Sequence, residues 1–565
     1  MSKIKPDRAF AKEIFSSFGG IGTKGETSSA GASEMRNFRI LPDGSIEKRC
    51  GWEVVHALPH RVRGVWQGTI DATLLTYAVC GQTVYSISSD GELTSVATLS
   101  SDEGRVHFQP YRGRLYLADG KRLYILSESK TVFTPAEGYA PQFGINWHPT
   151  EFGSVYEPLN LFSNRLRIHY FNSMGSNVFV LPFFPKTVDN VFIDGVTDVN
   201  FSFSGDRLTV SRIGSSVEIA MTIDMADLHQ TRLQEAEHLY ADRLDGREFM
   251  LVSSKRDPQY VYCSAKVDEV MLNTSKSVYP DSDPLYFKLD QILTVGTSDA
   301  PVSRFCTERD RVLAFCERGA VSISLSSESD AVESYPLLRG VGCVSLENDL
   351  YLEGNPVVAN SSGVFRLDRS ASEPDHFCAI ALGEQMPFCN DTEFLRNMIC
   401  CQDPQHSELW FRDASDSYGT VWIYNTVCAE WYCFSGIFAN FFIEIDGRLG
   451  FVMDNFICCF GEELCTDDGE VFEAVYTSGY LCFSSPESVK RSLRVSLCGW
   501  GCEATLELQS EKKTQRFALS ADKSDAPLVL DKRARFGRFR HLRFSLRDTG
   551  EHRSRWSRLA LYSNL

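Results

Sequence analysis

Short apolar segments separated by tight polar or glycine-containing turns recur along the chain. Two such segments in succession, each with an aromatic or β-branched core, predict a β-hairpin. The pattern predicts six hairpins, at residues 74–88, 113–127, 310–325, 348–368, 407–425 and 447–461. Their second strands begin near residues 84, 123, 321, 364, 421 and 457, so the steps are 39, 198, 43, 57 and 36 residues. Leaving aside the step of 198, this spacing brackets the period of roughly 40 to 50 residues of β-propeller blades, with unconnected hairpins in a sandwich as the alternative.

The long step indicates an insertion at about 140–240. Residues 164–172, 177–184 and 206–223 have the pattern of strands. Residues 225–243 are the best helical candidate, because their apolar positions fall on one broad arc at helical spacing. We therefore expect a small α+β insertion, and an ordinary blade with a long loop is the alternative.

The two ends of the chain differ from the repeats. Residues 15–52 open with a Gly/Ser/Thr-rich stretch, which is typical of an extended or mobile arm. Beyond residue 471, alternating strands without the hairpin signature predict a closing sandwich. The predicted fold is mainly β: an N-terminal arm and first strand over 1–60, a β-propeller over 61–470 with the insertion, and a C-terminal β-sandwich over 471–565.

The net charge and the cysteine spacing argue against some classes of function. The chain has 57 Lys and Arg against 74 Asp and Glu, a net charge of −17, which argues against a general polyanion binder. Its 18 cysteines contain no CxxC pair, so we interpret them as reduced, apolar core residues and predict no metal site. The charged N-terminus and the lack of a long apolar run predict synthesis in the cytoplasm and no membrane insertion.

Two sequence motifs suggest a binding site, but neither has the flanking secondary structure that such a site needs. Gly20–Gly25 matches G-x-G-x-x-G, but neither the preceding strand nor the following helix of a dinucleotide site is present. His56 and His60 stand four apart, and Pro59 disrupts the helix that would bring them together. We predict no catalytic and no cofactor-binding residues. The abundant acids leave a propeller glycosidase or carbohydrate-binding protein as the alternative.

Several stretches resemble the nozzle or tail-stabilisation proteins of short-tailed bacteriophages. MRNFRILPDGSIEKRCGW at 35–52 is similar to the opening segment of that family, and VWIYNTVCAEWYCF at 421–434 is similar to one of its strand pairs. Residues 241–269 resemble a recurrent run of the family, and GRFRHLRFSL at 537–546 resembles its closing strand. The cysteine enrichment and residues 128–240 depart from the family pattern.

The resemblance implies a structural virion protein and no enzymatic activity. Such a protein forms a homo-oligomeric ring, typically of six copies, that contacts the portal or adaptor and other tail proteins. The ring closes and extends the channel through which DNA leaves, without sequence-specific DNA binding. As candidate partner contacts we select the residues where the arm joins the first blade, whose alternative role is ordinary first-strand packing: Asn37, Phe38, Arg39, Lys48, Arg49 and Trp52.

Overall fold

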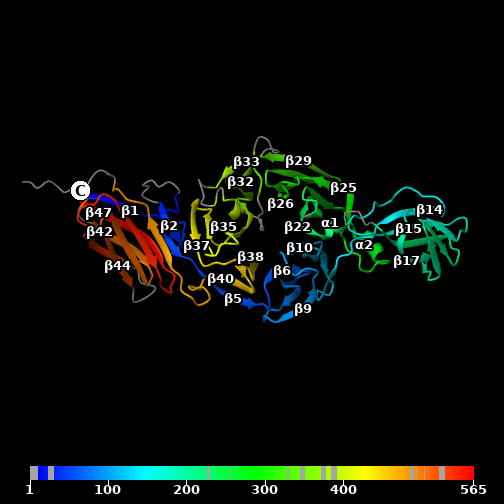
Figure 1. Ribbon diagram of the computed structural model, residues 1–565, viewed down its shortest axis with the longest axis horizontal. Coiled ribbons are helices and arrows are strands. Elements are labelled where there is room, and N and C mark those ends of the chain that lie inside the picture. Colours follow the sequence, from blue (N-terminus) through cyan, green and yellow to red (C-terminus); the bar gives the residue numbers. More distant parts are fainter. Residues whose placement is uncertain are drawn as a thin grey trace, which may run out of the picture. The chain divides into compact units, whose positions relative to one another are not determined.

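The computed structural model describes a chain built mainly of strands (Figure 1). The described residues are 10–22, 31–224, 230–254, 256–326, 330–343, 350–370, 377–382, 388, 391–483, 489–490, 493–501, 503–520 and 528–564. The chain divides into two compact units, one made of residues 1–62 with 344–565 and the other of residues 63–343. The two units are described separately below.

Four antiparallel sheets of four strands each, with the strands in chain order, form most of the second unit. The predicted hairpins at 74–88, 113–127 and 310–325 are the two central strands of three of these sheets, so the propeller-like repeat is confirmed at this level. The sheets consist of β6 (Val62–Ile70), β7 (Thr73–Cys80), β8 (Thr83–Ile87) and β9 (Leu93–Thr98); β10 (His107–Tyr111), β11 (Arg114–Ala118), β12 (Leu123–Leu126) and β13 (Phe133–Pro135); β22 (Ala236–Leu244), β23 (Arg247–Ser254), β24 (Tyr260–Ser264) and β25 (Phe287–Thr294); and β26 (Val302–Glu308), β27 (Arg311–Cys316), β28 (Gly319–Leu325) and β29 (Val332–Arg339).

The sheet β22–β25 was not among the predicted hairpins, and a helix interrupts it between its last two strands. Helix α2 (Glu269–Lys276) lies between β24 and β25, and Asp268 caps it by accepting a hydrogen bond from the Met271 amide at 2.8 Å. The helix predicted over 225–243 is wrong for most of its length. Only α1 (Gln230–Gln234) is helical, and residues 225–229 lie outside the described part of the chain. The rest of the span is strand β22, which pairs with β23 along its whole length, so tertiary pairing overrides the helical pattern.

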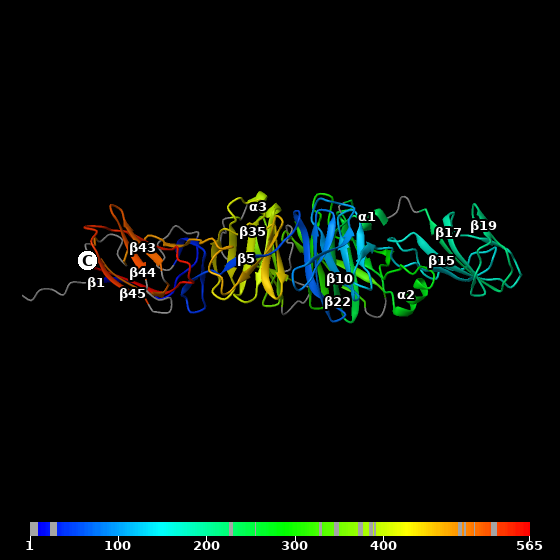
Figure 2. The ribbon, with the colours of Figure 1, turned by 90° about the horizontal axis from the view of Figure 1, so that it is seen from below.

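The insertion between β13 and β22 forms two β-sheets around its own apolar core. Strands β15, β16, β20 and β21 confirm the strands predicted there. Figure 2 labels β15, β17 and β19 in this region. The larger sheet has the order β14 (Gln142–Trp147), β15 (Arg165–Phe171), β21 (Ser216–Ile223), β17 (Pro185–Ile193) and β18 (Val196–Thr197), and the smaller has the order β16 (Val178–Val180), β20 (Arg207–Val210) and β19 (Phe201–Ser204).

The other unit contains three further blade-like arrangements. The predicted hairpins at 348–368, 407–425 and 447–461 supply their central strands, although residues 348–349 lie outside the described range. Strand β5, from the N-terminal part of the chain, completes the last arrangement by pairing with β40. The strands are β30 (Tyr351–Leu352), β31 (Asn355–Asn360), β32 (Gly363–Arg369) and β33 (Phe377–Ala381); β34 (Met398–Asp403), β35 (Glu408–Asp413), β36 (Val421–Asn425) and β37 (Glu430–Phe434); and β38 (Phe441–Ile445), β39 (Arg448–Met453), β40 (Phe456–Gly461) and β5 (Gly51–Ala57).

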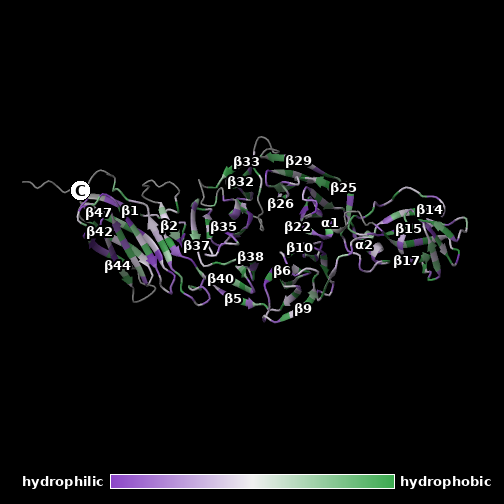
Figure 3. Cartoon of the chain, in the orientation of Figure 1, coloured by the Kyte–Doolittle hydropathy of each residue, from purple (hydrophilic) through white to green (hydrophobic). Residues whose placement is uncertain are grey.

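The C-terminal strands form a sandwich in which the N-terminal segment takes part. Strands β1 and β4 pair with β47, and β2 pairs with β41, so the predicted separate arm is corrected for its described residues; residues 23–30 are outside them. Apolar and polar bands alternate along these strands in Figure 3. The members are β1 (Phe10–Phe15), β2 (Ala32–Arg36), β3 (Phe38–Ile40), β4 (Ile46–Lys48), β41 (Ala474–Ser478), β42 (Leu493–Trp500), β43 (Glu503–Ser510), β44 (Thr514–Ser520), β45 (Leu528–Ala534), β46 (Leu542–Asp548) and β47 (Arg555–Asn564).

Strand β2 joins this sandwich to a blade-like sheet. It pairs with β41 on one side and with β37 on the other, so β34–β37 and the sandwich strands form one sheet of nine strands. The three helices among the described residues are short, α3 (Thr392–Arg396) being the third, and none is long and apolar enough to cross a membrane. The N-terminal segment thus lies inside one unit, against strands from residues 400–565.

The first residue of β5 allows a close approach that only glycine permits. A Cβ atom on Gly51 would lie 1.8 Å from the Thr466 carbonyl oxygen. We expect Gly51→Ala to lower the free energy of unfolding by about 1–3 kcal/mol, because the backbone of residue 466 must shift. The matched control is Gly22→Ala, whose added Cβ meets nothing within 4 Å. Urea unfolding of both variants checks this, and equal stabilities would contradict it.

Candidate functional site

The six predicted contact residues lie in the interior of their unit. Their exposed fractions are only 0 to 7%, so they form no docking surface in the folded chain. The alternative interpretation, packing of the first strands, describes them correctly. The packing is unusual in one respect, since three of the six residues carry a positive charge: Arg39, Lys48 and Arg49.

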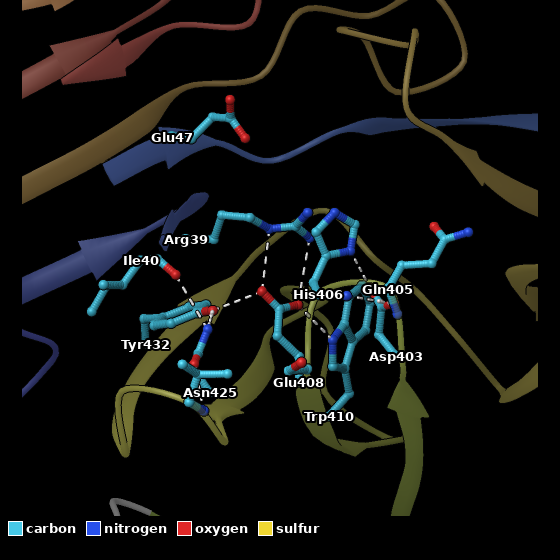
Figure 4. Close-up of polar contacts among 12 residues, drawn as sticks. Arg39, Ile40, Glu47, Asp403, Gln405, His406, Glu408, Trp410, Asn425 and Tyr432 are labelled. Carbon is cyan, nitrogen blue, oxygen red and sulfur yellow. Dashed lines mark hydrogen bonds and ion pairs between the residues drawn. The ribbon is translucent and has the colours of Figure 1, made fainter. Parts of the chain in front are cut away.

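Arg39 forms a buried ion pair with Glu408 at the start of β35. The Arg39 Nε and Glu408 Oε1 atoms are 3.2 Å apart, and their side chains are 1% and 0% exposed. The carboxylate also accepts hydrogen bonds from the Tyr432 hydroxyl at 2.7 Å and from Trp410 Nε1 at 3.0 Å. Figure 4 shows these three side chains pointing toward Glu408. The partners therefore neutralise and hydrogen-bond a charge that burial alone would disfavour.

The pKa values follow from this arrangement. Burial, the largest single cause, disfavours the charged guanidinium, but the charge of Glu408 and smaller contributions from other nearby groups together outweigh it and raise the pKa of Arg39 above its ordinary value. Burial, with Glu408 as the second cause, raises the pKa of Tyr432 well above 10. Arg39 is therefore charged and the Tyr432 hydroxyl is a hydrogen-bond donor at neutral pH.

Arg49 makes a second buried pair, with Asp467. Its two terminal nitrogens lie 2.8 and 2.6 Å from the two carboxylate oxygens, a bidentate geometry, and the guanidinium lies 3.8 Å from the centre of the Phe472 ring. Arg49 Nε donates to Asn37 Oδ1 at 3.1 Å, and Asn37 Nδ2 donates to the Glu473 carbonyl at 2.7 Å. Residues more than 400 positions apart are thus connected through two side chains.

Lys48 makes the third pair. Its ammonium donates to the Gly550 carbonyl at 2.5 Å and lies 3.9 Å from Asp548 Oδ1. Burial lowers the pKa of Lys48 and raises the pKa of Asp548. We call Arg39, Lys48, Arg49 and their three acids the N-terminal joint, because it ties the first strands to three distant parts of the same unit.

A cavity of about 370 Å³ lies beside the joint and contains a second polar network. His406 Nδ1 is 2.7 Å from Asp403 Oδ2, and His406 Nε2 is 3.0 Å from Glu462 Oε1. Glu462 is also paired with Arg553 at 2.6 Å. The lining residues are Cys50, Glu53, Asp403, Gln405, His406, Trp410, Arg448, Leu449, Phe460, Gly461, Glu462, Glu463 and Leu464.

Asp403, His406 and Glu408 are the one group among the described residues whose ligand atoms, all within 4.8 Å of one another, could converge on a metal ion. The donor set does not suit a cation, because Glu408 already pairs with Arg39, a positive group that would repel it. Cys50 supplies no nucleophile, since burial raises the pKa of its thiol. His406 thus bridges two of the carboxylates that line the cavity, Asp403 and Glu462.

Asp403 gives a pH-dependent contribution to stability. Burial, the largest single cause, opposes its ionisation, but the hydrogen bonds and charge of His406 together with the charge of Arg39 outweigh burial and lower the pKa of Asp403. A lowered pKa in the folded state stabilises the fold above the unfolded pKa of about 4. This stabilisation declines as pH falls below that value and is lost as pH falls through the lower pKa of the folded state. We expect Asp403→Asn to cost about 1–3 kcal/mol at pH 7.

Urea unfolding of the wild type and of Asp403→Asn between pH 7 and pH 3 checks this expectation. The difference between the two proteins should shrink below about pH 4, because the wild-type carboxyl becomes protonated. Asp531→Asn is the control: Asp531 pairs with Arg494, and the two side chains are 46% and 59% exposed. A difference that stays constant across the pH range would contradict the assigned role of Asp403.

The sequence drew attention to residues 37–52 but not to their partners. Asp403 and Glu408 lie opposite each other in the β34–β35 hairpin, a local signal that a hairpin register can supply. Arg39, Glu462 and Arg553 come from elsewhere in the chain, and no sequence pattern connects them. The sequence therefore pointed to one side of the joint only.

Comparisons with known proteins give weak structural similarities. No family model and no curated protein matches the chain. The solved structures it resembles include the AfRom2 CNH domain, with 10% identity, 72% of this chain and 97% of that one covered, and a TM-score of 0.35. They also include a putative gluconolactonase, with 9% identity, coverage of 73% and 91%, and a TM-score of 0.29. An exo-β-1,3-galactanase from Phanerochaete chrysosporium has 7% identity, coverage of 90% and 99%, and a TM-score of 0.22. At these TM-scores, none of the three bears on what this chain does.

Proposed function

We propose that the chain is a structural protein of a bacteriophage tail, a subunit of a nozzle or stabilisation ring that closes and extends the DNA exit channel. The observation that carries this proposal is the N-terminal joint. Three buried cation–acid pairs tie β3–β5 to residues 408, 467 and 548. Removing one partner of such a pair leaves an uncompensated charge in the interior, so separating the first strands from these three acids is strongly disfavoured.

The charge of the chain supports the same proposal. A net charge of −17 repels the phosphates of DNA, so DNA would slide along an acidic channel wall without sequence-specific binding. The sequence resemblance to tail nozzle and stabilisation proteins adds a ring, typically of six copies, with the portal or adaptor and other tail proteins as partners. The virion tail is then the place of action.

Negative-stain electron microscopy tests this function. We expect the purified full-length chain to form rings, alone or on addition of portal and adaptor proteins of the same phage. Glu462→Gln, which alters the cavity beside the joint, should leave ring formation unchanged. A chain that stays monomeric and never joins a portal–adaptor complex would overturn the proposal.

A second candidate function is carbohydrate binding or glycoside hydrolysis. It is favoured by the cavity of about 370 Å³ that combines four carboxylates with Trp410 and Phe460, since paired acids and aromatic rings suit a sugar. A glycan array and a polysaccharide-hydrolysis assay separate the two candidates. Binding or cleavage that is lost in Glu462→Gln would replace the structural proposal, and inactivity in both assays would eliminate the second candidate.

A further inference from the structure

Exposed apolar side chains are concentrated in the insertion. Among the described residues, 26 large apolar side chains are exposed, and 11 of these lie between Gln142 and Ile223. The insertion also has a buried apolar core of its own, so the 11 side chains are exposed although the insertion is folded around other apolar residues. Exposed apolar groups gathered in this way mark a contact with a protein or a membrane.

Five of the 11 gather at one end of the insertion. Strands β15 and β17 both run toward this end, because Phe171 pairs with Ser216 and Ile193 pairs with Val217 at the start of β21. The chain enters at β14 and leaves after β21 at the opposite end, where Gln142 pairs with Arg167 and Arg165 pairs with Thr222. The end with the exposed side chains is therefore the one farther from where the insertion joins the rest of its unit.

Three turns form this end, at residues 172–176, 194–200 and 211–215. The exposed apolar side chains of these turns and of Phe171, the last residue of β15, are 54 to 79% exposed, and we call them the apolar tip: Phe171, Met174, Val196, Val199 and Ile213. The turns lie close together, since a Cβ on Gly175 would be 3.7 Å from Ile213 Cγ2 and Arg212 Nη2 donates to the Val196 carbonyl at 3.2 Å. The apolar tip is one surface made from three separate pieces of sequence.

Side chains within the turns satisfy much of the polar backbone of the tip. Asn172 Nδ2 donates to the Ser176 and Gly214 carbonyls at 2.8 and 2.9 Å. Asp194 Oδ1 accepts from the Ser215 and Ser216 amides, each at 2.9 Å. Polar backbone groups without partners are what keeps irregular segments out of hydrocarbon, and these bonds reduce that cost.

The composition and position of the tip favour a lipid partner over a protein partner. None of the five is Trp, Tyr or Arg, the residues that dominate the hot spots of protein interfaces, and two are Val, which is under-represented there. They lie on or beside turns, where they project outward, and a fluid hydrocarbon phase needs no complementary shape. The neighbouring charges are Asp194, Asp198 and Arg212, a balance of −1, so the tip has no basic patch that would require anionic lipid.

We propose that the apolar tip binds the surface of a phospholipid bilayer, with its five side chains placed below the headgroups of zwitterionic lipids. Arg212 Nη2 also donates to the Ile193 carbonyl at 2.7 Å, and as a long charged side chain it suits the headgroup level. This inference does not depend on the proposed function, because it rests only on the insertion. Ring formation and lipid binding can each fail without the other.

Co-sedimentation with vesicles tests the proposal. The full-length protein is mixed with vesicles of phosphatidylcholine and phosphatidylethanolamine, and we expect it to sediment with them. The double variant Met174→Ser with Ile213→Ser should bind at least about tenfold more weakly, because it removes two of the largest exposed groups of the tip. The matched control is Leu289→Ser with Val427→Ser, whose side chains are also exposed but lie outside the insertion; its binding should match the wild type.

Three outcomes would overturn the proposal. The first is wild-type protein that has a cooperative thermal transition and does not bind the vesicles. The second is an equal loss of binding in the tip variant and in the control variant. The third is self-association of the wild type in light scattering that the tip variant loses, without vesicle binding by either protein, which would identify a second copy of the chain as the occupant.

Discussion

Glu408→Leu is expected to lower the free energy of unfolding by about 3–5 kcal/mol, the range found when one partner of a buried ion pair is removed. The Arg39 guanidinium, 1% exposed, would remain without its counter-charge. The Tyr432 hydroxyl and Trp410 Nε1 would also lose their common acceptor. Urea unfolding followed by tryptophan fluorescence measures the change, using the first transition if the two units unfold separately.

Two further variants separate the ion pair from the loss of a side chain. Arg39→Leu combined with Glu408→Leu should be more stable than Glu408→Leu alone, because no uncompensated charge stays buried. Glu507→Leu is the control, since Glu507 pairs with Arg516, whose side chain is 74% exposed, and should cost less than about 1 kcal/mol. A Glu408→Leu protein as stable as the Glu507→Leu protein would show that the pair does not hold the joint.

Arg49→Leu is expected to cost about 3 kcal/mol, the second-largest effect in the joint. The change removes a bidentate pair with Asp467, whose side chain is 10% exposed, and the contact with the Phe472 ring. It also leaves Asn37 Oδ1 without the hydrogen bond from Nε. Thermal and urea unfolding measure the loss.

Arg49→Lys tests whether geometry or charge alone matters at this position. Lysine keeps the positive charge but lacks the planar fork, so we expect it to recover only part of the lost stability. Arg494→Leu is the matched control, because Arg494 forms an ion pair with Asp531 while 59% exposed. Full recovery by lysine, or an equal loss in the control, would contradict the assigned geometry.

The hairpins could be predicted because their signal is local. Alternation of apolar residues and turn-forming residues lies within about 15 to 20 positions, and all six predicted pairs are hydrogen-bonded strands. The sheet β22–β25 was missed because the helix predicted over 225–243 covers most of β22, and α2 separates its last two strands. The long helix predicted over 225–243 failed because the pairing of β22 with β23 outweighs a helical pattern.

The apolar tip shows why some surfaces cannot be found by scanning a sequence. The prediction of no membrane insertion rested on the lack of a long apolar run. Met174, Val199 and Ile213 are isolated in polar turns, and only the pairing of β15, β17 and β21 brings these turns to one end. A surface assembled from separate turns leaves no continuous apolar stretch.

Periodicity alone established the class of this chain, mainly β with a blade-like repeat, because strand pairing within hairpins is a short-range effect. The folded chain decided the role of Asn37, Phe38, Arg39, Lys48, Arg49 and Trp52, which the sequence marked as partner contacts and the structure buries. Their partners, Glu408, Asp467 and Asp548, lie about 370 to 500 positions away. A sequence pattern predicts that arginine and lysine lie on the surface, because these residues are rarely buried. Their burial here depends on acidic side chains far away in the sequence, which only the folded chain places beside them.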